Sequence, residues 1–448
     1  MGLSRMAYIL NTEDDVRAML AAIGLGSLDQ LFDSIPSELQ LKRPLNVPEA
    51  LSELALTSHA AELASRNVSA AEKPCFLGGG AYDHFIPAAV EQLAGRGEFF
   101  TAYTPYQPEA SQGTLQAIFE YQTLIAQLTG MDISNASLYD GGSAVAEAAL
   151  MALATTGRSR VVIAGTVHPE YGQIARTYLA NLPVEVVIVQ DAAALNAAVD
   201  DKTAALVIQQ PNFFGQLEDT PALVKLAHDH KALAIVSVDA VSLGLLNRPG
   251  DYGADIVVAE GQPLGNALTY GGPYLGILAC REAFVRKLPG RIVGQTTDRS
   301  GKRCWVLTLQ TREQHIRREK ATSNICTNQG LMALRASIYL ALLGPHGLRA
   351  AAELSTRKAH YAAEELAKIP GLTLAFDGPF FKEFVVRVKG RDANDVLAAV
   401  EDAGYHGGIA LGQWYSAMKD CILIAVTEKR TKAEIDGLAR AYRSSLGG

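Results

Sequence analysis

The stretch Ala232-Leu-Ala-Ile-Val-Ser-Val-Asp239 decides the fold, together with Gly253-Ala-Asp-Ile-Val-Val-Ala-Glu-Gly-Gln262, which follows after a short break. Both stretches read as short apolar β-strands, and the first ends in a carboxylate. A carboxylate at the end of a buried strand is unfavourable unless it is paired. We therefore expect a specific partner for Asp239, for which a bound ring cation, an arginine or backbone amides would all serve.

Strands and helices alternate through the middle of the chain. Apolar runs predict strands at residues 136–139, 160–164, 184–189, 204–209, 232–239, 255–259 and 274–279. Helical patterns fall between most of them, at residues 143–155, 169–180, 192–199 and 220–230. Continuous apolar strands joined by helices are typical of a mostly parallel sheet that is covered on both faces.

The two flanks have different patterns, and 448 residues exceed the ~250–300 that one hydrophobic core usually holds. Residues 12–97 are expected to be mostly helical, with Pro48-Glu49 opening one helix. After residue 329 two long helices, 329–343 and 348–367, precede a second set of short strands and helices. We predict a helical N-terminal segment (1–100), a large α/β domain (101–328) and a small C-terminal α/β domain (329–448).

Composition excludes several classes of protein. The chain is 48% hydrophobic and 19% charged, which excludes a largely disordered protein. Its net charge is −7 with Lys and Arg spread along the chain, so no basic face for nucleic acid is expected. Five dispersed cysteines without a Cys-x-x-Cys pair predict neither a disulfide framework nor a zinc site.

The beginning of the chain bears on location. Met1–Leu10 is mildly apolar but is followed at once by Glu13, Asp14 and Asp15, which is unlike a signal or transit peptide. No run approaches the ~20 apolar residues of a membrane span. We expect a soluble, cytoplasmic protein.

Two motifs follow predicted strands at the edge where ligands of open α/β sheets collect. Gly141-Gly142-Ser143 opens a helix, whose N-terminal N–H groups and dipole would hold a phosphate. The alternative is a tight turn in which Ser143 is simply a helix cap. His168 follows the next strand, where an aromatic ring would cover a flat cofactor. The alternative is again a capping or interface residue.

The chain lacks a lysine at the position where catalysis on a bound cofactor would need one. In pyridoxal-phosphate (PLP) enzymes of the aspartate-aminotransferase type, a strand-ending Asp pairs with the pyridinium nitrogen and the next strand leads to the Schiff-base lysine. Asp239 matches the first role, yet no lysine occurs between Asp239 and Lys287. Catalysis on PLP needs such an amine, so we do not expect this chain to catalyse the reaction alone.

Two further stretches remain. The aromatic, Pro-broken loop Phe99–Glu109 contains Tyr103, Tyr106 and Gln107, whose polar groups suit a pocket wall or an interface. The alternative is a surface loop whose aromatic rings pack into the core. The mixed-charge stretch 312–324 is most simply a solvated helix, although an anion or partner site is also consistent with it.

At these motifs the sequence resembles the P-protein of the glycine cleavage system, glycine dehydrogenase (decarboxylating). The match is to the N-terminal half of the long form, or equivalently to the alpha chain, subunit 1, of the split form. The resemblance covers essentially the whole chain and is carried by the motifs Tyr103-Thr-Pro-Tyr-Gln-Pro-Glu-Ala-Ser-Gln-Gly113, Asn135–Ala148, Tyr270-Gly-Gly-Pro-Tyr274, Pro289–Gly294 and Leu309–Cys326.

The resemblance implies the fold, the partners and the reaction. The fold would be PLP-dependent transferase fold type I, and a homologous subunit 2 would carry the Schiff-base lysine and PLP in an α2β2 tetramer. The complex would decarboxylate glycine and pass the aminomethyl group to the lipoyl group of the H-protein. Tyr103, Tyr106 and Gln107 would contribute to the partner's site, and a vestigial pocket would retain Gly141, Gly142, Ser143, His168 and Asp239.

Three interpretations remain open. In the first, the chain supports the catalytic site of its partner. In the second, it is a structural or regulatory subunit that only stabilises the partner. In the third, it is a PLP enzyme that uses an out-of-place amine such as Lys320. The first also predicts that Ala259–Asn266 fills a closed-down pocket.

Overall fold

The computed structural model describes residues 10–447. The chain divides into two compact units, Met1–Asn67 and Val68–Gly448. Residues 1–9, on which part of the leader-peptide argument rests, lie outside the described residues. The three-part division at residues 100 and 328 stays a prediction.

The N-terminal unit contains fewer helical residues than the sequence predicts. Its helices are α1 (Glu13–Ala22) and α2 (Glu53–Ala64), with a 3-10 turn η1 (Asp29–Phe32) between them. Thr12 and Asp15 form a reciprocal capping box at α1, and Ser52 caps α2. The expected helix start at Pro48 is therefore wrong, because the side chain of Ser52 supplies the cap four residues later. With α3 (Ala88–Ala94) and α4 (Gly97–Phe100) added, most of residues 12–97 is still loop.

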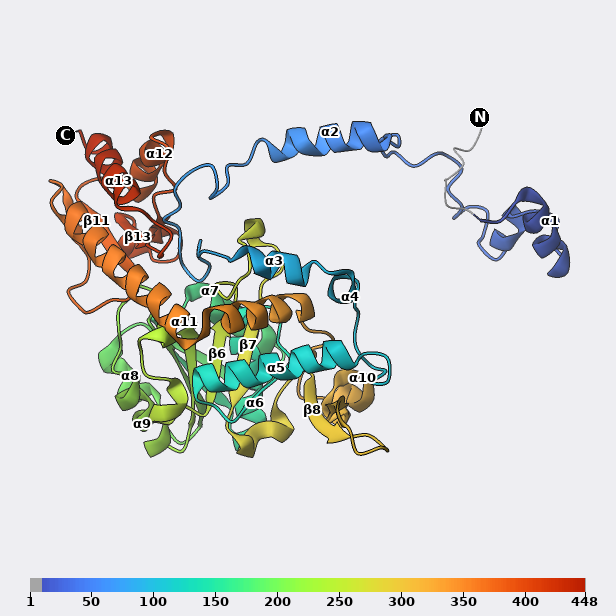
Figure 1. The fold of residues 1–448 in the computed structure, drawn as a ribbon, viewed down its shortest axis with the longest axis horizontal. Coiled ribbons are helices and arrows are strands. Elements are labelled where there is room, and N and C mark those ends of the chain that lie inside the picture. The colour runs from blue at the N-terminus through green and yellow to red at the C-terminus, as the bar shows by residue number, and fades with distance from the viewer. Residues whose placement is uncertain (1–9, 448) are drawn as a thin grey trace. The chain divides into compact units, whose positions relative to one another are not determined.

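A mostly parallel seven-stranded sheet forms the body of the second unit, in the order β1-β7-β6-β5-β4-β2-β3. The pairs among β2 to β6 are parallel, whereas β7 pairs antiparallel with β6 and with β1. Helices cover the sheet (Figure 1). The strands are β1 (Ile133–Ser134), β2 (Arg160–Ala164), β3 (Glu185–Val189), β4 (Thr203–Gln210), β5 (Leu233–Asp239), β6 (Ile256–Glu260) and β7 (Gly276–Cys280). The helices are α5 (Gln112–Thr129), α6 (Gly141–Thr156), α7 (Pro169–Leu179), α8 (Ala192–Ala198) and α9 (Thr220–Asp229).

The central strands are apolar because both faces of the sheet are buried. Leu206, Ile235, Val236 and Val257 are all fully buried in one core. Burying a side chain of this size contributes roughly 1.5–3 kcal/mol. A charged substitution at Val236 would therefore disrupt the centre of the sheet, and with it the position of Asp239 three residues later.

Two local predictions are wrong. Residues 136–139 form a loop instead of a strand, because Ser137 has φ 115° and Ala136 donates its N–H to the carbonyl of Arg291. The antiparallel hairpin of β8 (Ile292–Thr297) and β9 (Arg303–Thr308) was also not predicted. Short 3-10 turns and the helical turn α10 (Gln314–Arg317) surround this hairpin. These turns are η5 (Glu282–Lys287), η6 (Gln310–Arg312) and η7 (Arg318–Lys320).

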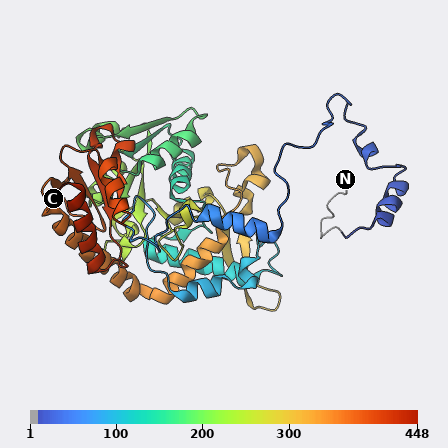
Figure 2. The ribbon, with the colours of Figure 1, turned by 90° about the horizontal axis from the view of Figure 1, so that it is seen from above.

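A second core lies in the C-terminal part. A four-stranded sheet in the order β10-β11-β13-β12 packs with two helices. The elements are β10 (Leu372–Leu374), β11 (Glu383–Val388), β12 (Ile409–Ala410), β13 (Cys421–Ala425), α12 (Ala393–Asp402) and α13 (Lys432–Ser445). Viewed from above, these elements gather at one end of the second unit (Figure 2).

The long helix α11 (Gly330–Ala367) joins the two cores. Tyr339 and Leu340 belong to the large core, while Ala362 and Leu366 belong to the small one. The two predicted helices are one element with a kink at Gly344, whose φ is 58°, followed by Pro345. By length and composition α11 is also apolar enough to cross a membrane, a test that core helices of soluble proteins pass as well.

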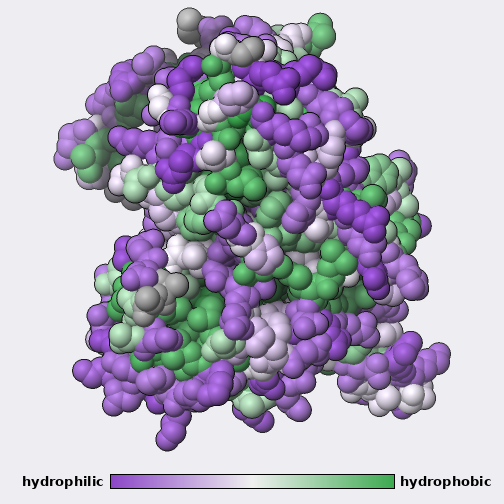
Figure 3. All heavy atoms as spheres, turned by 90° about the vertical axis from the view of Figure 1, so that its left-hand side faces the viewer, coloured by the Kyte–Doolittle hydropathy of each residue, from purple (hydrophilic) through white to green (hydrophobic). Residues whose placement is uncertain are grey.

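On the face that carries the C-terminal part, hydrophilic residues form most of the surface and hydrophobic residues gather in the hollows between them (Figure 3).

Candidate functional site

The five residues predicted for a vestigial pocket come together at the carboxyl edge of the large sheet. Asp239 ends β5, His168 caps α7, and Gly141, Gly142 and Ser143 begin α6. His168, Asp239 and Gly142 line two adjoining cavities at this edge. β2 and β5 both end at this edge because the carboxyl ends of parallel strands meet there, whereas α6 begins after the loop 136–139.

Asp239 has a partner that the sequence did not identify. The ammonium of Lys382, which immediately precedes β11, lies 2.7 Å from Asp239 Oδ2. The other carboxylate oxygen accepts hydrogen bonds from the backbone N–H of Val241 (2.9 Å) and of Ser242 (3.4 Å). Both oxygens are therefore satisfied by the protein itself.

The Lys382 ammonium is enclosed on its remaining sides. It lies 3.4 Å from the centre of the Tyr82 ring and 2.9 Å from Nε2 of His84. Only 1% of its side chain is exposed. A buried ammonium is stable when it is paired and hydrogen-bonded, and this site provides a carboxylate, a ring face and an imidazole nitrogen.

His84 continues this polar chain toward the surface. Its Nδ1 lies 2.6 Å from Glu428 Oε2, so Nδ1 carries the proton and Nε2 accepts from Lys382. Burial lowers the pKa of His84, and the nearby ammonium of Lys382 lowers it further. The hydrogen bond with His84 contributes to holding the pKa of Glu428 at about 2, against the opposing effect of burial.

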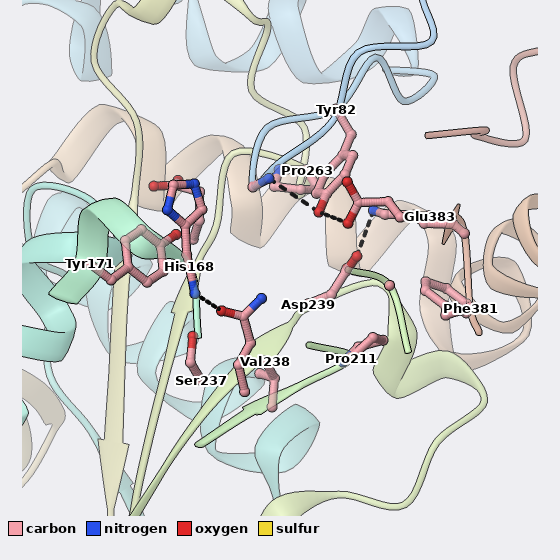
Figure 4. Close-up of a pocket in the computed structure, with 15 residues that line it drawn as sticks. Tyr82, His168, Tyr171, Pro211, Ser237, Val238, Asp239, Pro263, Phe381 and Glu383 are labelled. Carbon is pink, nitrogen blue, oxygen red and sulfur yellow. Dashed lines mark hydrogen bonds and ion pairs between the residues drawn. The ribbon is translucent and has the colours of Figure 1, made fainter. Parts of the chain in front are cut away.

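Glu383 holds the segment Gly79–Tyr82, which we call the strap, over the pocket. Its Oε1 accepts the N–H of Gly79 (2.7 Å), and its Oε2 accepts the hydroxyl of Tyr82 (2.7 Å). Burial raises the pKa of Glu383 to about 7. Figure 4 shows Tyr82, Asp239 and Glu383 pointing toward one another. The strap and the segment before β11 thus meet over the end of β5.

His168 is held as a capping residue. Its Nδ1 accepts the N–H of Glu170 (3.2 Å), and its Nε2 lies 2.8 Å from the carbonyl oxygen of Gly79. Its ring stacks on Tyr171, with 4.5 Å between centroids. Burial lowers its pKa, so the ring is neutral. One face of the His168 ring is therefore covered by the protein's own tyrosine.

The N-terminus of α6 is occupied by carboxylates. Asp140 caps the helix by accepting from the backbone N–H and the hydroxyl of Ser143, at 2.8 and 3.2 Å. Glu260 Oε2 accepts the N–H of Gly141 at 2.9 Å. Burial raises the pKa of Glu260 to about 7, although three backbone N–H groups oppose that shift. The helix cap predicted for Ser143 is supplied by Asp140 instead.

Tyr103, Tyr106 and Gln107 lie in a different region, on the loop before α5. The side chain of Tyr103 is 85% exposed, and Tyr106 and Gln107 are also exposed. Tyr103 lines a groove of about 180 Å3 with the rings of Phe99 and Phe100. The structure therefore separates the predicted site residues into an enclosed pocket and an open surface.

A buried arginine anchors the open surface. Arg291 donates to the hydroxyl of Tyr106 (3.2 Å), the carbonyl of Cys326 (2.9 Å) and the side chain of Asn328 (3.1 Å). Glu313 is buried nearby, and its Oε2 lies 3.9 Å from Arg291 Nε and 3.7 Å from Nδ1 of the half-exposed His315. The His315 ring meets Tyr106 edge-on at 6.0 Å. Charged groups thus support this surface from beneath.

The fold and the site define the class of protein. A mostly parallel sheet, a smaller C-terminal domain and a strand-ending Asp beside a helix N-terminus are the parts of the fold type I PLP-dependent enzymes. The structure is similar over 92% of the chain to sphingosine-1-phosphate lyase of Burkholderia pseudomallei, with a TM-score of 0.64 and 17% identity, covering 94% of that chain. That likeness shows the fold.

The particular family follows from closer relatives. The model of the glycine cleavage system P-protein family matches residues 6–442, and the chain belongs to that family. It is 52% identical to the probable glycine dehydrogenase (decarboxylating) subunit 1 of Carboxydothermus hydrogenoformans over 99% of this chain and 100% of the relative. The corresponding protein of Prosthecochloris aestuarii is 53% identical over 96% and 98%. A crystal structure of an inhibitor-bound glycine decarboxylase (P-protein) superposes with a TM-score of 0.91 at 42% identity, covering 98% and 100%.

The residues at this pocket do not fit the cofactor that the fold implies. A pyridinium would have to displace Lys382 from Asp239, and the cavity left beside them measures only about 30 Å3. Ligand pockets are typically ten times larger or more. Lys382 is no substitute for a Schiff-base lysine, because it takes the place of the ring nitrogen, at the opposite end of the ring from the aldehyde carbon.

The phosphate group does not fit either. A wider cleft of about 630 Å3 opens over the N-terminus of α6, lined by Asp140, Glu170 and Glu260, and the described lining contains neither Lys nor Arg. A Cβ at Gly142 would lie only 2.4 Å from Ile174, so the side chain of Ile174 already fills the cradle there. Three carboxylates repel a phosphate dianion.

Sequence reasoning missed the groups that close the pocket, which are Tyr82, Lys382 and Glu383. The prediction that Ala259–Asn266 fills it is only partly right, since Glu260 and Pro263 line the cavity while Lys382 occupies the position at Asp239. One signal was available in the sequence, since Lys382-Glu383 is a charged pair at the start of an apolar strand. Lys320 is exposed in η7 and does not line the cavity.

Proposed function

We propose that this chain is the cofactor-free subunit of a two-subunit glycine decarboxylase. Its partner is a homologous subunit 2 that binds PLP through its own lysine, and the two form an α2β2 tetramer in the cytoplasm. Support comes from the relatives, which are named subunit 1 and are matched over nearly their whole length. Alone, the chain is inactive.

The complex decarboxylates glycine and transfers the remaining carbon to the H-protein. Glycine loses its carboxylate as CO2, and the remaining aminomethyl carbon bonds to one sulfur of the lipoyl disulfide on the H-protein. That disulfide is reduced, and its second sulfur takes up a proton. The chemistry takes place at subunit 2, and this chain supplies part of the wall of that site.

The pairing of Lys382 with Asp239 is the observation that carries the proposal. At 2.7 Å and with Lys382 1% exposed, the ammonium satisfies the carboxylate from within the chain. Because a buried charge is costly unless it is paired, this pairing makes the folded subunit independent of a cofactor. The pocket around His168, Asp239 and Gly141–Ser143 is then vestigial.

The open surface is the part that the complex uses. Tyr103, Tyr106 and Gln107 present hydroxyl and amide groups on a loop that Arg291 anchors from beneath. In the complex these side chains line the partner's site. Large exposed aromatic rings are frequent at protein interfaces, which is the environment proposed for them.

The test is reconstitution. Subunit 2 is produced with and without this chain, and release of CO2 from glycine is measured with lipoylated H-protein present. The proposal expects a stable complex and glycine-dependent CO2 release that requires both chains. Full activity of subunit 2 alone, or of this chain alone, would refute it.

One observation favours a purely structural subunit as the alternative. The Tyr106 hydroxyl already accepts a hydrogen bond from Arg291 within its own chain, so the ring also has a role in holding this loop. In that case the chain would stabilise subunit 2 without contributing to its site. A conservative substitution at Tyr106, described below, separates the two functions.

A further inference from the structure

A strongly basic segment lies beside the Tyr106 loop. Residues 281–320 contain eleven Lys and Arg against four Asp and Glu, whereas the whole chain has a net charge of −7. Lys and Arg occur along the whole chain, but they are denser in this segment than in the rest. Its charges are carried by η5, the β8–β9 hairpin, α10 and η7, which form one continuous part of the chain.

Residues of η5, η6 and α10, with the loops next to them, line a small cavity with basic and hydroxyl groups in its wall. The cavity measures about 80 Å3, enough for a carboxylate, and its lining includes Arg286, Lys287, Arg317, Thr322 and Ser323. Hydroxyl and cationic donors around one small space suit a carboxylate oxygen.

Other charged groups lie in the wall of the cavity and behind it. Arg312 also lines the cavity and donates to the carbonyls of Leu288 and Gly290, which fixes the wall. Glu313 is buried and faces Arg291 and His315. Glu147 lies behind Ser323; burial raises the pKa of Glu147, and the hydroxyl of Ser323 opposes that rise.

In the part of the chain that the structure describes, the exposed cations of this face have no acidic partner. Within residues 10–447, the side chains of Arg286, Lys287, Arg318 and Lys320 form no ion pair or hydrogen bond, and Arg317 bonds only to the carbonyl of Lys320. Some arginines elsewhere do have acidic partners, as Arg160 has in both Glu185 and Asp200. A group of like charges without counter-charges destabilises the free protein and attracts an oppositely charged partner.

The position of the basic face indicates which partner it suits. The His315 ring of α10 meets Tyr106 edge-on, so the face borders the loop proposed to line the active site. The neighbouring groove at Phe99, Phe100 and Tyr103 is aromatic and apolar. Permanent subunit interfaces are typically apolar, whereas exposed charges mainly raise the rate of encounter with partners that come and go.

We propose that this basic face, defined by Arg286, Lys287, Arg317, Arg318 and Lys320, docks a carboxylate-rich surface of the H-protein. This inference rests on the proposed function, in which the H-protein visits the complex in each turnover. A carboxylate of the H-protein enters the cavity between Arg286 and Arg317, and the lipoyl arm then extends past Tyr106. The H-protein must therefore present acidic residues around the base of its lipoyl arm.

Charge reversal in the assembled complex tests the docking. The variant Arg286→Glu/Lys287→Glu and the variant Arg317→Glu/Arg318→Glu are compared with the control Lys202→Glu/Lys389→Glu, which reverses two exposed, unpaired lysines outside this face. Initial rates are measured against lipoylated H-protein and against glycine. At low ionic strength, the KM for H-protein should rise about tenfold or more in both test variants and should not change in the control. The kcat and the KM for glycine should stay unchanged.

Two further measurements keep the outcomes distinct. Gel filtration and thermal unfolding show whether each variant still folds and assembles with subunit 2. Binding of lipoylated H-protein to the complex, followed by surface plasmon resonance at 20 and 300 mM salt, does not depend on turnover. A complex that lacks decarboxylase activity overturns the proposed function, while this binding measurement still decides the docking.

An unchanged affinity for H-protein in both test variants would overturn the docking proposal. Loss of assembly with subunit 2, with H-protein affinity retained by the remaining complex, would assign the face to subunit 2 instead. An equal effect in the control variant would show a general effect of net charge and would also overturn it.

Discussion

The Asp239 pocket and the Tyr106 surface contain the same kinds of side chain and use them in opposite ways. In the pocket, Lys382 pairs with Asp239 and His84 with Glu428, and almost nothing of these groups is exposed. At the surface, Tyr103 is 85% exposed, and among the described residues the side chains of Arg286, Lys287, Arg318 and Lys320 form no ion pair. The chain has satisfied its polar groups where a cofactor would bind in this fold and left them unsatisfied where another protein would bind.

The largest expected effect is in the pocket. Lys382→Met removes the cation and leaves Asp239 buried with an uncompensated charge, which should cost about 3–5 kcal/mol of unfolding free energy. Urea denaturation of the isolated chain measures this loss. The double variant Lys382→Met/Asp239→Asn removes both charges and should recover most of it. If the single variant lost under about 1 kcal/mol, the pocket would not be closed by this pair.

A smaller effect on stability is expected at Glu147, which lies behind the basic face. Glu147 is 1% exposed, its Oε2 has no hydrogen-bond partner, and burial raises its pKa to about 7 from the usual 4.5. The folded state therefore holds a proton that the unfolded state releases between pH 4.5 and 7, so stability falls as the pH rises through this range.

The neutral variant Glu147→Gln should remove this penalty. It should stabilise the chain at pH 8 by roughly 3 kcal/mol at most, since each unit of pKa shift corresponds to about 1.4 kcal/mol. The gain should nearly vanish at pH 4.5 to 5. Thermal unfolding of both proteins across pH 4.5–8 is the measurement. A gain that does not depend on pH would contradict the assignment.

The smallest effect on stability is expected from a substitution at the surface. The same substitution should have the largest effect on activity. Tyr106→Phe removes one hydrogen bond of 3.2 Å from Arg291, which should cost the isolated chain about 1 kcal/mol or less. In the reconstituted complex, turnover should fall while assembly stays intact. Phe85→Leu, at an exposed ring outside this loop, serves as the control. Unchanged turnover of Tyr106→Phe would favour the purely structural subunit.

The sequence predicted the parts of the fold that depend on local patterns. The run Ala232–Asp239 is recognisable because consecutive buried residues form β5, and the break between two long helices is marked by Gly344-Pro345. The β8–β9 hairpin was missed because Gln295-Thr-Thr297 is polar and exposed, although Asp298-Arg-Ser-Gly301 is a typical turn sequence. The polarity of the side chains does not identify a strand whose backbone hydrogen bonds are made to its hairpin partner.

The partner of Asp239 was beyond local reasoning. The sequence showed that this carboxylate needs a counter-charge, but the charged pair Lys382-Glu383 before an apolar strand does not indicate which distant carboxylate Lys382 contacts. The contacts of Glu383 with Gly79 and Tyr82 likewise join segments about 300 residues apart. Sequence patterns state what a buried charge requires, and only the packed domains show which residue supplies it.

The most direct test of the central claim locates the cofactor. The complex of this chain with subunit 2 is incubated with PLP, reduced with borohydride and digested, and mass spectrometry identifies the lysine that carries the phosphopyridoxyl group. We predict the label on a lysine of subunit 2 and none on this chain. A label at Lys382 or Lys320 of this chain would contradict it.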